Sequence, residues 1–373
     1  MRTIARTALR LSIAAGVLGG CVAVAAENPS YQVELVSEGF EHPWALTFLN
    51  EREALVTERP GRLSRVDVTT GERQTIEGIP EVAVVNQGGL LDVALHPDFE
   101  ETRWVYLSYA GAGEGGYATH VGRGRLDGNY LEDFEVIHVA TPFTGGGQHF
   151  GSRLVFDAEG YLFVTVGDRG DRDRSQQLGN HQGTTLRLHE DGRIPADNPF
   201  VDREDAKPAI YSYGHRNAQG MTLHPETGVL WQHEHGPRGG DEVNLPRAGE
   251  NYGWPVTSYG REYSDGSPIG PDPHERDDMV APVYHWHDSY APSGMTFYTG
   301  DAFPEWRNDL FIGSLARRHL TRLSVDGEAI TGEETLLADR RWRIRDVRTG
   351  PDGYLYLLVD SNDAPLVRLR PTE

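Results

Sequence analysis

The chain has 373 residues, 38% of them apolar, and contains 44 glycines and 22 prolines. This composition excludes a disordered or fibrous protein and predicts a soluble, turn-rich globular protein with a large core. A formal net charge of −21 excludes nucleic acid as a partner, since phosphate backbones attract basic surfaces. Because Lys207 is the only lysine, nearly all positive charge comes from arginine.

The first segment, residues 1–26, is predicted to be a secretory signal peptide. Arginines precede an apolar stretch at 11–18, and small residues continue to Ala26. We therefore expect residues 27–373 to form the mature domain, periplasmic or secreted. Cys21, the only cysteine, follows Leu-Gly-Gly as in a lipoprotein box, but the alanines after it are typical of an ordinary cleavage site, so lipoprotein and soluble export both stay open. No later apolar run is long enough to cross a bilayer, so we expect the protein not to span a membrane.

One motif recurs after the leader: an apolar strand, a tight turn rich in Pro, Asp, Gly or Asn, and a second apolar strand. Its six copies start at Leu46, Val93, Leu154, Met221, Met295 and Val347. No long segment shows helical periodicity. The repeats predict one all-β domain, a six-bladed β-propeller with loop insertions. The strand-like YQVELV from Tyr31 is expected to pair with APLVRLRP near the C-terminus and close the ring.

Loops at one end of a propeller channel converge, so residues distant in sequence can form one site. The candidate loops supply Gln87, His149, Asp168, Arg216, Asn217, Gly236, Pro237, Arg343 and Arg345. The arginines and the asparagine suit an anionic or carbonyl-bearing ligand. The turn from Gly236 to Glu242 is rich in oxygen ligands of the kind calcium prefers. Together they predict a metal-assisted cofactor site.

Two other patterns are set aside. The string GAGEGG at 111–116 fits a dinucleotide-binding motif, but a β-like segment follows it where that motif needs a helix. His233 and His235 alternate like strand residues with no convincing third ligand nearby, which argues against zinc.

The chain resembles the PQQ-dependent soluble sugar dehydrogenases of the glucose/sorbosone dehydrogenase family, in particular the aldose sugar dehydrogenase branch. The resemblance covers about residues 33–371 and rests on motifs that keep their order along the repeats. They are NQGGLLDVALHPDF, the stretch from His149 to VGDRG, GHRNAQG, HGPRGGDEVN, GENYGWP and RIRDVRTGPDGYLYLL. The family is a six-bladed propeller that oxidises the C1 hydroxyl of an aldose to a lactone, using pyrroloquinoline quinone (PQQ) and calcium.

The resemblance implies roles for individual residues. His149 matches the catalytic base, and Asp168 would hold its ring and stabilise the imidazolium. Gln87 and Gln148 match positions near the sugar. The remaining matches are to the cofactor and to two calcium ions: Arg216, Asn217, Arg343 and Arg345 to PQQ, the carbonyls of Gly236 and Pro237 to the calcium that also chelates PQQ, and Glu242 and Tyr252 to a second, structural calcium. Electrons would pass to an external acceptor.

Two departures from the longer, glucose-oxidising branch favour a broad aldose preference. Gln148 replaces an aspartate, and Ala316 replaces a cofactor-binding lysine, for which Arg317 or Arg318 is a candidate substitute. Two alternatives from other classes remain: a calcium-dependent propeller lactonase or other hydrolase, and a non-catalytic carbohydrate-binding propeller. A hydrolase would need several carboxylate or Asn ligands converging on its metal, whereas this chain offers arginines.

Overall fold

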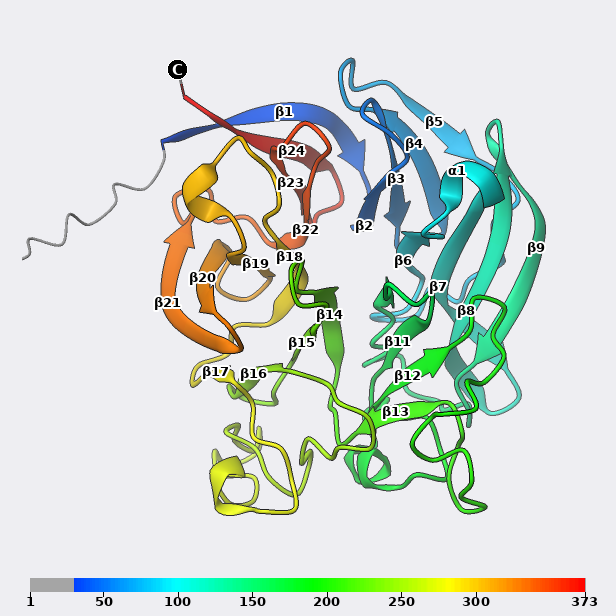
Figure 1. Ribbon diagram of the computed structural model, residues 1–373, viewed down its shortest axis with the longest axis vertical. Helices are drawn as coiled ribbons and strands as arrows, with labels where there is room; N and C mark the ends of the chain where they lie inside the picture. Colours follow the sequence, from blue (N-terminus) through cyan, green and yellow to red (C-terminus); the bar gives the residue numbers. More distant parts are fainter. Residues whose placement is uncertain (1–29, 373) are drawn as a thin grey trace, which may run out of the picture.

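The computed structural model describes residues 30–372, which form six four-stranded antiparallel sheets arranged as blades around a central axis (Figure 1). The predicted six-bladed β-propeller is confirmed. The proposed signal peptide, including Cys21, lies outside the described residues. Among the described residues, no helix has the length and apolar character needed to cross a membrane.

Each blade is a run of consecutive strands, innermost first. The first blade contains β2 (Pro43–Phe48), β3 (Glu53–Glu58), β4 (Arg62–Asp67) and β5 (Arg73–Ile76). The second contains β6 (Leu90–Leu95), β7 (Trp104–Gly113), β8 (Gly116–Asp127) and β9 (Tyr130–Val139). The third contains β10 (Leu154–Phe156), β11 (Leu162–Val166), β12 (Thr184–Leu188) and β13 (Ile210–Tyr213).

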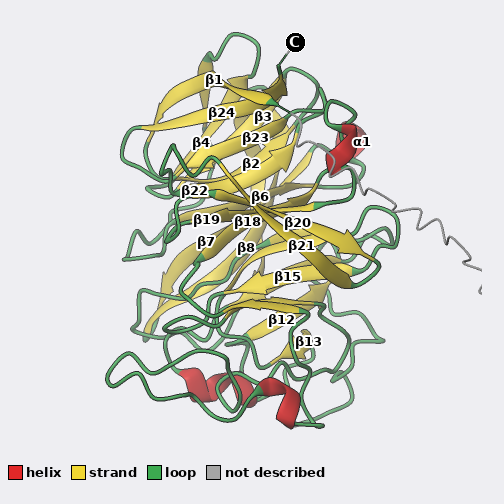
Figure 2. Ribbon diagram, turned by 90° about the vertical axis from the view of Figure 1, so that its left-hand side faces the viewer, coloured by secondary structure: helices red, strands yellow, loops and turns green. Residues whose placement is uncertain are grey.

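The remaining blades follow the same plan. The fourth contains β14 (Ala218–Leu223), β15 (Leu230–Glu234), β16 (Asp241–Asn244) and β17 (Tyr284–Trp286). The fifth contains β18 (Pro292–Phe297), β19 (Leu310–Ser314), β20 (Leu320–Asp326) and β21 (Ala329–Leu336). The last contains β22 (Ile344–Thr349), β23 (Leu355–Val359), β24 (Ala364–Pro371) and β1 (Tyr31–Phe40). Short helical turns lie in the connections: α1 (Phe99–Thr102), η1 (Arg172–Gln176), η2 (Pro273–Glu275) and η3 (Pro304–Trp306) (Figure 2).

The ring closes where the two ends of the chain meet. β1 pairs antiparallel with β24, with Tyr31 opposite Pro371 and Leu35 opposite Val367. This confirms the predicted pairing, which covers two strand edges that would otherwise be open to other chains. The GAGEGG string falls in the β7–β8 hairpin, as its β-like continuation predicted.

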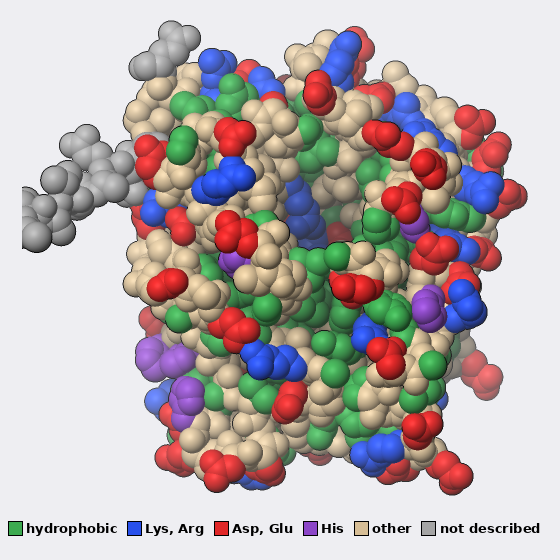
Figure 3. Space-filling view, in the orientation of Figure 1, with side chains coloured by type: hydrophobic (Ala, Val, Ile, Leu, Met, Phe, Trp, Pro, Cys, Tyr) green, Lys and Arg blue, Asp and Glu red, His purple; other side chains and the backbone are tan. Residues whose placement is uncertain are grey.

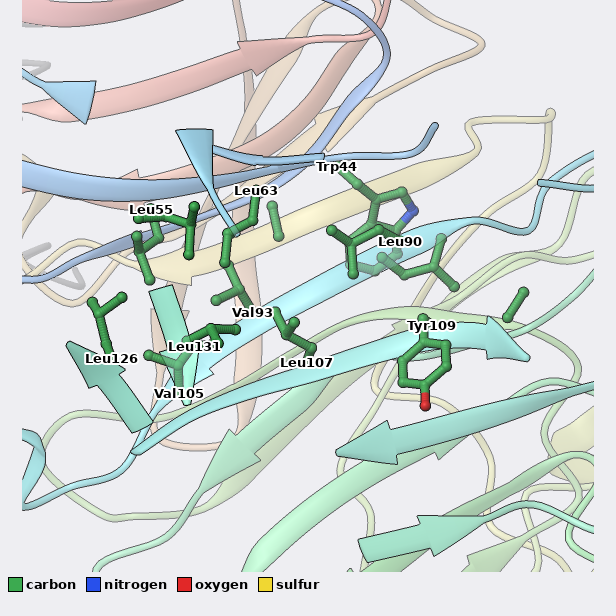
Figure 4. Packing of buried hydrophobic residues seen from close by; sticks show 14 of the residues in the cluster. Trp44, Leu55, Leu63, Leu90, Val93, Val105, Leu107, Tyr109, Leu126 and Leu131 are labelled. Carbon is green, nitrogen blue, oxygen red and sulfur yellow. The ribbon is translucent and has the colours of Figure 1, made fainter. Parts of the chain in front are cut away.

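The core lies between neighbouring blades. Figure 4 shows one such cluster, in which Trp44 and Leu55 of the first blade pack against Leu90, Val93 and Leu107 of the second. Every one of these side chains is at most 3% exposed. Because each blade buries both faces against its neighbours, the ring holds the innermost strands in fixed positions.

An ion network crosses the centre of the ring. Arg153 donates to Asp92 at 2.7 Å and lies 3.5 Å from Asp346, and Arg348 lies 3.3 Å from Asp346. The Arg153 guanidinium also stacks 4.4 Å from the ring centroid of Trp44. Two arginines and two aspartates balance in charge, as burial requires, and they link three innermost strands.

Candidate functional site

The predicted site residues come from one end of the propeller. Gln87, His149, Arg216 and Arg343 each lie just before the innermost strand of a different blade. In β2, β6, β14, β18 and β22, the antiparallel register shifts near that same end. Such bulges turn side chains out of the sheet, which directs these residues toward the channel mouth. Figure 3 shows a hollow at the centre of the ring with basic side chains in it.

A cavity of about 520 Å³ opens at this end, and it is strongly basic. Its lining includes the guanidinium-bearing residues Arg59, Arg343 and Arg345, together with Gln87 and one acid, Asp360. Three arginines against one aspartate leave an excess of positive charge inside an acidic protein. The cavity therefore fits a planar ligand that carries several carboxylates.

Asp360 orders the arginines of this cavity. Its Oδ2 atom lies 2.9 Å from Nη2 of Arg343 and 3.7 Å from Nη2 of Arg345, and Oδ1 lies 2.7 Å from Nδ1 of His42. Burial opposes ionisation of Asp360, but these partners outweigh it and lower its pKa. Arg343 also donates to the carbonyl of Leu315 at 3.0 Å. The guanidinium groups are thus held in place before any ligand arrives.

A second cavity, of about 210 Å³, contains the predicted acid–base pair. Nδ1 of His149 lies 2.6 Å from Oδ1 of Asp168, and Oδ2 of Asp168 accepts a hydrogen bond from the indole of Trp254 at 2.9 Å. Burial tends to raise the pKa of Asp168, but the bond to His149 and the charge of Arg216 outweigh burial and lower it. In the described part of the chain no hydrogen bond engages Nε2 of His149.

The chain around this pair is shaped to bring two loops together. His149 has a φ of 53°, and a Cβ on Gly167 would lie 2.1 Å from the His149 carbonyl oxygen, so only glycine fits beside it. The amide of Gly170 donates to Asp168 at 2.7 Å and fixes the carboxylate within its turn. The short β10 and β11 strands thus end in loops that hold the histidine against its partner.

Three contacts connect the two cavities. Gln87, which lines the larger one, accepts a hydrogen bond from the backbone amide of His149 at 2.9 Å. Arg216, which lines the smaller one, donates to the carbonyls of His235 and Gly236 at 3.1 and 2.7 Å. His235 lines the larger cavity, and burial, together with the charges of Arg216, His149 and Arg345, lowers its pKa to about 3. The predicted residues therefore form one two-part site.

Asn217 lies behind this site. It is fully buried, its side-chain oxygen accepts from the amide of Gly151 at 3.1 Å, and its Nδ2 atom has no hydrogen-bond partner among the described residues. This position supports the loop that carries His149. Gln148 does line the smaller cavity beside His149.

The Gly236 turn offers two carbonyl oxygens for a cation. Arg216 already donates to the Gly236 oxygen, and the Tyr263 hydroxyl donates to the Pro237 oxygen at 2.8 Å. Each carbonyl retains a second lone pair, but calcium takes six to eight oxygens. In the described chain no cluster of three or more His, Cys, Asp or Glu residues is arranged to hold a metal. These carbonyls fit calcium only if a bound cofactor and water complete its ligands.

The second predicted calcium site has a different character. Glu242 is buried, and burial plus the charges of Glu234 and Asp241 raise its pKa well above the usual value, despite a hydrogen bond to Asn244. The side-chain oxygen of Asn244 is buried without a hydrogen-bond partner within the described residues. A cation would satisfy both groups. Tyr252 stacks on His215 and bonds the Leu245 carbonyl through its hydroxyl, so only its backbone oxygen is suited to a cation.

Sequence reasoning missed Arg59 and Asp360. Both lie where the second strand of a blade ends, the position that Asp168 occupies in the third blade, so superposing the repeats would have found them. The candidate replacements for the absent lysine lie elsewhere. Arg317 pairs with Asp288 at 2.8 Å, Arg318 is exposed, and neither lines the larger cavity, although Ala316 does.

The comparisons with known proteins agree with this geometry. The family model described as Glucose / Sorbosone dehydrogenase matches residues 40–368. The chain belongs to this family. It is 45% identical over 347 residues to the aldose sugar dehydrogenase YliI of Escherichia coli, covering 91% of this chain and 92% of that one.

Solved structures of the glucose/sorbosone dehydrogenase type share the fold. The soluble aldose sugar dehydrogenase of E. coli, in its apo form, superposes with a TM-score of 0.89 and 43% identity over 92% of this chain and 100% of that one. The PQQ-bound aldose sugar dehydrogenase of Streptomyces coelicolor gives a TM-score of 0.76 and 27% identity over 92% and 99% of the two chains.

Proposed function

We propose that this protein oxidises the C1 hydroxyl of aldose sugars to lactones in a PQQ- and calcium-dependent reaction. The observation that carries the proposal is the basic cavity of Arg59, Arg343 and Arg345 joined to the His149–Asp168 pair. Relatives named aldose sugar dehydrogenases, one of them solved with PQQ bound, support it.

The cavity residues would hold PQQ through its carboxylates. Arg343 and Arg345 are prearranged by Asp360, and Arg59 adds a third guanidinium. Arg216, at the junction of the two cavities, adds a further positive group. Bound PQQ supplies a two-electron acceptor for the hydride from C1, and calcium beside it supplies Lewis-acid polarisation.

His149 would act as the general base. Since Nδ1 is committed to Asp168, Nε2 is the atom that takes the proton of the C1 hydroxyl. Asp168 stabilises the resulting imidazolium, and its bonds from Gly170 and Trp254 keep it in position. Loss of the hydroxyl proton and of the C1 hydride leaves a C1 carbonyl, which in a cyclic aldose is the lactone. Gln87 and Gln148 lie on either side of the base and would contact sugar hydroxyls.

The two calcium ions would have separate tasks. One would be shared between PQQ and the carbonyls of Gly236 and Pro237. The other would neutralise Glu242 with help from the backbone oxygen of Tyr252. We also propose export through the segment 1–26, as a periplasmic or secreted protein with or without lipid on Cys21, and transfer of electrons to an external acceptor.

Reconstitution tests the proposal. Purified protein is given PQQ and calcium, an aldose panel and an artificial electron-accepting dye. Dye reduction that requires both PQQ and calcium is expected. Folded, PQQ-loaded protein that reduces no dye with any aldose would refute the dehydrogenase assignment, and hydrolysis of a lactone without PQQ would favour a propeller lactonase. His149→Ala should lose turnover yet still bind PQQ, whereas loss of PQQ binding would contradict its role as the base.

A further inference from the structure

We propose that the hairpin at 261–268 forms the outer wall of the sugar site and that Tyr263 stacks on the sugar ring. This inference rests on the proposed function and adds a residue that determines substrate affinity. Tyr263 lines the same cavity of about 210 Å³ as His149 and Gln148. The cavity also has apolar walls from Trp254 and Ile269, and its volume matches one pyranose ring.

The hairpin is held firmly beside the base. Its strands are bridged at Arg261 and Pro268, and Arg261 exchanges backbone hydrogen bonds of 3.2 and 3.3 Å with Arg238, next to Pro237. The amide of Glu262 donates to the carbonyl of Ser267 at 2.8 Å and closes the turn. The hairpin therefore moves with the Gly236 turn rather than as a free loop.

A second contact ties the hairpin across the cavity. The carboxylate of Glu262 lies 2.6 Å from Nη1 of Arg172, which belongs to η1 and follows the Asp168 turn. Both residues line the cavity. The ion pair thus joins the wall that carries Tyr263 to the wall that carries the acid–base pair.

Tyr263 is an unusual side chain for a surface turn. It is 67% exposed, yet its hydroxyl is fixed by the 2.8 Å bond to the Pro237 carbonyl. An exposed aromatic ring held in one orientation loses little freedom when a ligand covers it. The C–H face of a pyranose suits the negative face of such a ring, and its hydroxyls remain free for Gln148 and His149. The chemistry of the cavity therefore selects a pyranose with a free C1 hydroxyl.

Variants of Tyr263 test the proposal in PQQ- and calcium-loaded protein. Tyr263→Ala should raise KM for glucose about fivefold to tenfold with kcat little changed, and should raise equally the inhibition constant of methyl glucoside, which lacks a free C1 hydroxyl. Tyr263→Phe, which keeps the ring, should stay within about twofold of wild type. Tyr130→Ala is the control, because Tyr130 is 52% exposed but lines neither cavity of the site.

The outcomes separate this inference from the proposed function. Wild-type protein without aldose oxidation would refute the function itself. Active wild type with unchanged KM and inhibition constant in Tyr263→Ala would refute the stacking role alone. A fall in kcat or in PQQ affinity with unchanged KM would also refute it, because the tyrosine would then act through the Pro237 carbonyl. Tyr263→Trp supplies a second variant that should retain tight sugar binding.

Discussion

Replacing Asp168 by asparagine tests the acid–base pair with the smallest change in shape. One Asp168 oxygen accepts from His149 and from the Gly170 amide, and the other accepts from Trp254. An asparagine has only one acceptor oxygen. If that oxygen faces His149 and Gly170, its NH₂ group meets the indole N–H of Trp254. If it faces Trp254, the NH₂ group meets the Gly170 amide and also turns His149 into the tautomer with a proton on Nε2.

Each orientation leaves one buried donor facing another, and both remove the negative charge beside the imidazole. A buried unsatisfied donor costs about 1–3 kcal/mol, so we expect Asp168→Asn to lower the free energy of unfolding by about 2 kcal/mol. Turnover should fall by about 10³-fold to 10⁴-fold, as it does when the aspartate of a serine-protease triad is changed in the same way. This corresponds to about 4–5.5 kcal/mol in the activation barrier.

The assay compares wild type and Asp168→Asn after reconstitution, following dye reduction, PQQ affinity and urea unfolding. PQQ affinity should change by less than about threefold, because the carboxylate lines the smaller cavity rather than the basic one. A variant that folds, binds PQQ and keeps more than about a tenth of wild-type turnover would show that Asp168 and His149 are not the acid–base unit.

Further predictions concern the charges around the site. Arg59→Gln should weaken PQQ binding to cofactor-free protein about tenfold by fluorescence titration, and Arg317→Gln should leave it unchanged; the reverse pattern would place the third guanidinium elsewhere. Because its folded pKa is lowered, Asp360 should contribute stability above about pH 4 that is lost as pH falls through the lowered pKa. Asp360→Asn should thus cost about 2 kcal/mol in urea unfolding at pH 7 and less at pH 3, and a pH-independent cost would contradict this. Arg153→Met leaves two buried aspartates without their partner and should cost about 3–5 kcal/mol in the same assay; a cost below about 1 kcal/mol would contradict the central network. Calcium alone should raise the Tm of cofactor-free wild type, Glu242→Gln should lose that rise, and an equal rise in both would argue against the buried calcium site.

The repeats made the fold predictable because each blade has the same local code. A short apolar strand, a turn with Gly or Asp, and a second strand recur six times, and strand pairing within each unit is local. Ring closure was predictable for the same reason, since the pattern left β1 and β24 unpaired at the two ends.

The site was only partly predictable. His149 and Asp168 were placed together because each ends a strand of the same blade, and the structure pairs them at 2.6 Å. Arg59 escaped attention because its turn resembles any exposed turn, and only the closed ring brings it to Arg345. The burial of Asn217 likewise depends on packing between blades, which no local pattern encodes.

The central claim is that a basic cavity and a histidine base together oxidise C1 of an aldose, and a single anaerobic turnover measures this most directly. PQQ- and calcium-loaded protein is mixed with glucose in the absence of any acceptor, and the absorbance of bound PQQ is followed. We expect one equivalent of PQQ to be reduced, more slowly with glucose deuterated at C1 and not at all with methyl glucoside. Bound PQQ that stays oxidised with every aldose, or that reacts equally with methyl glucoside, would contradict the account.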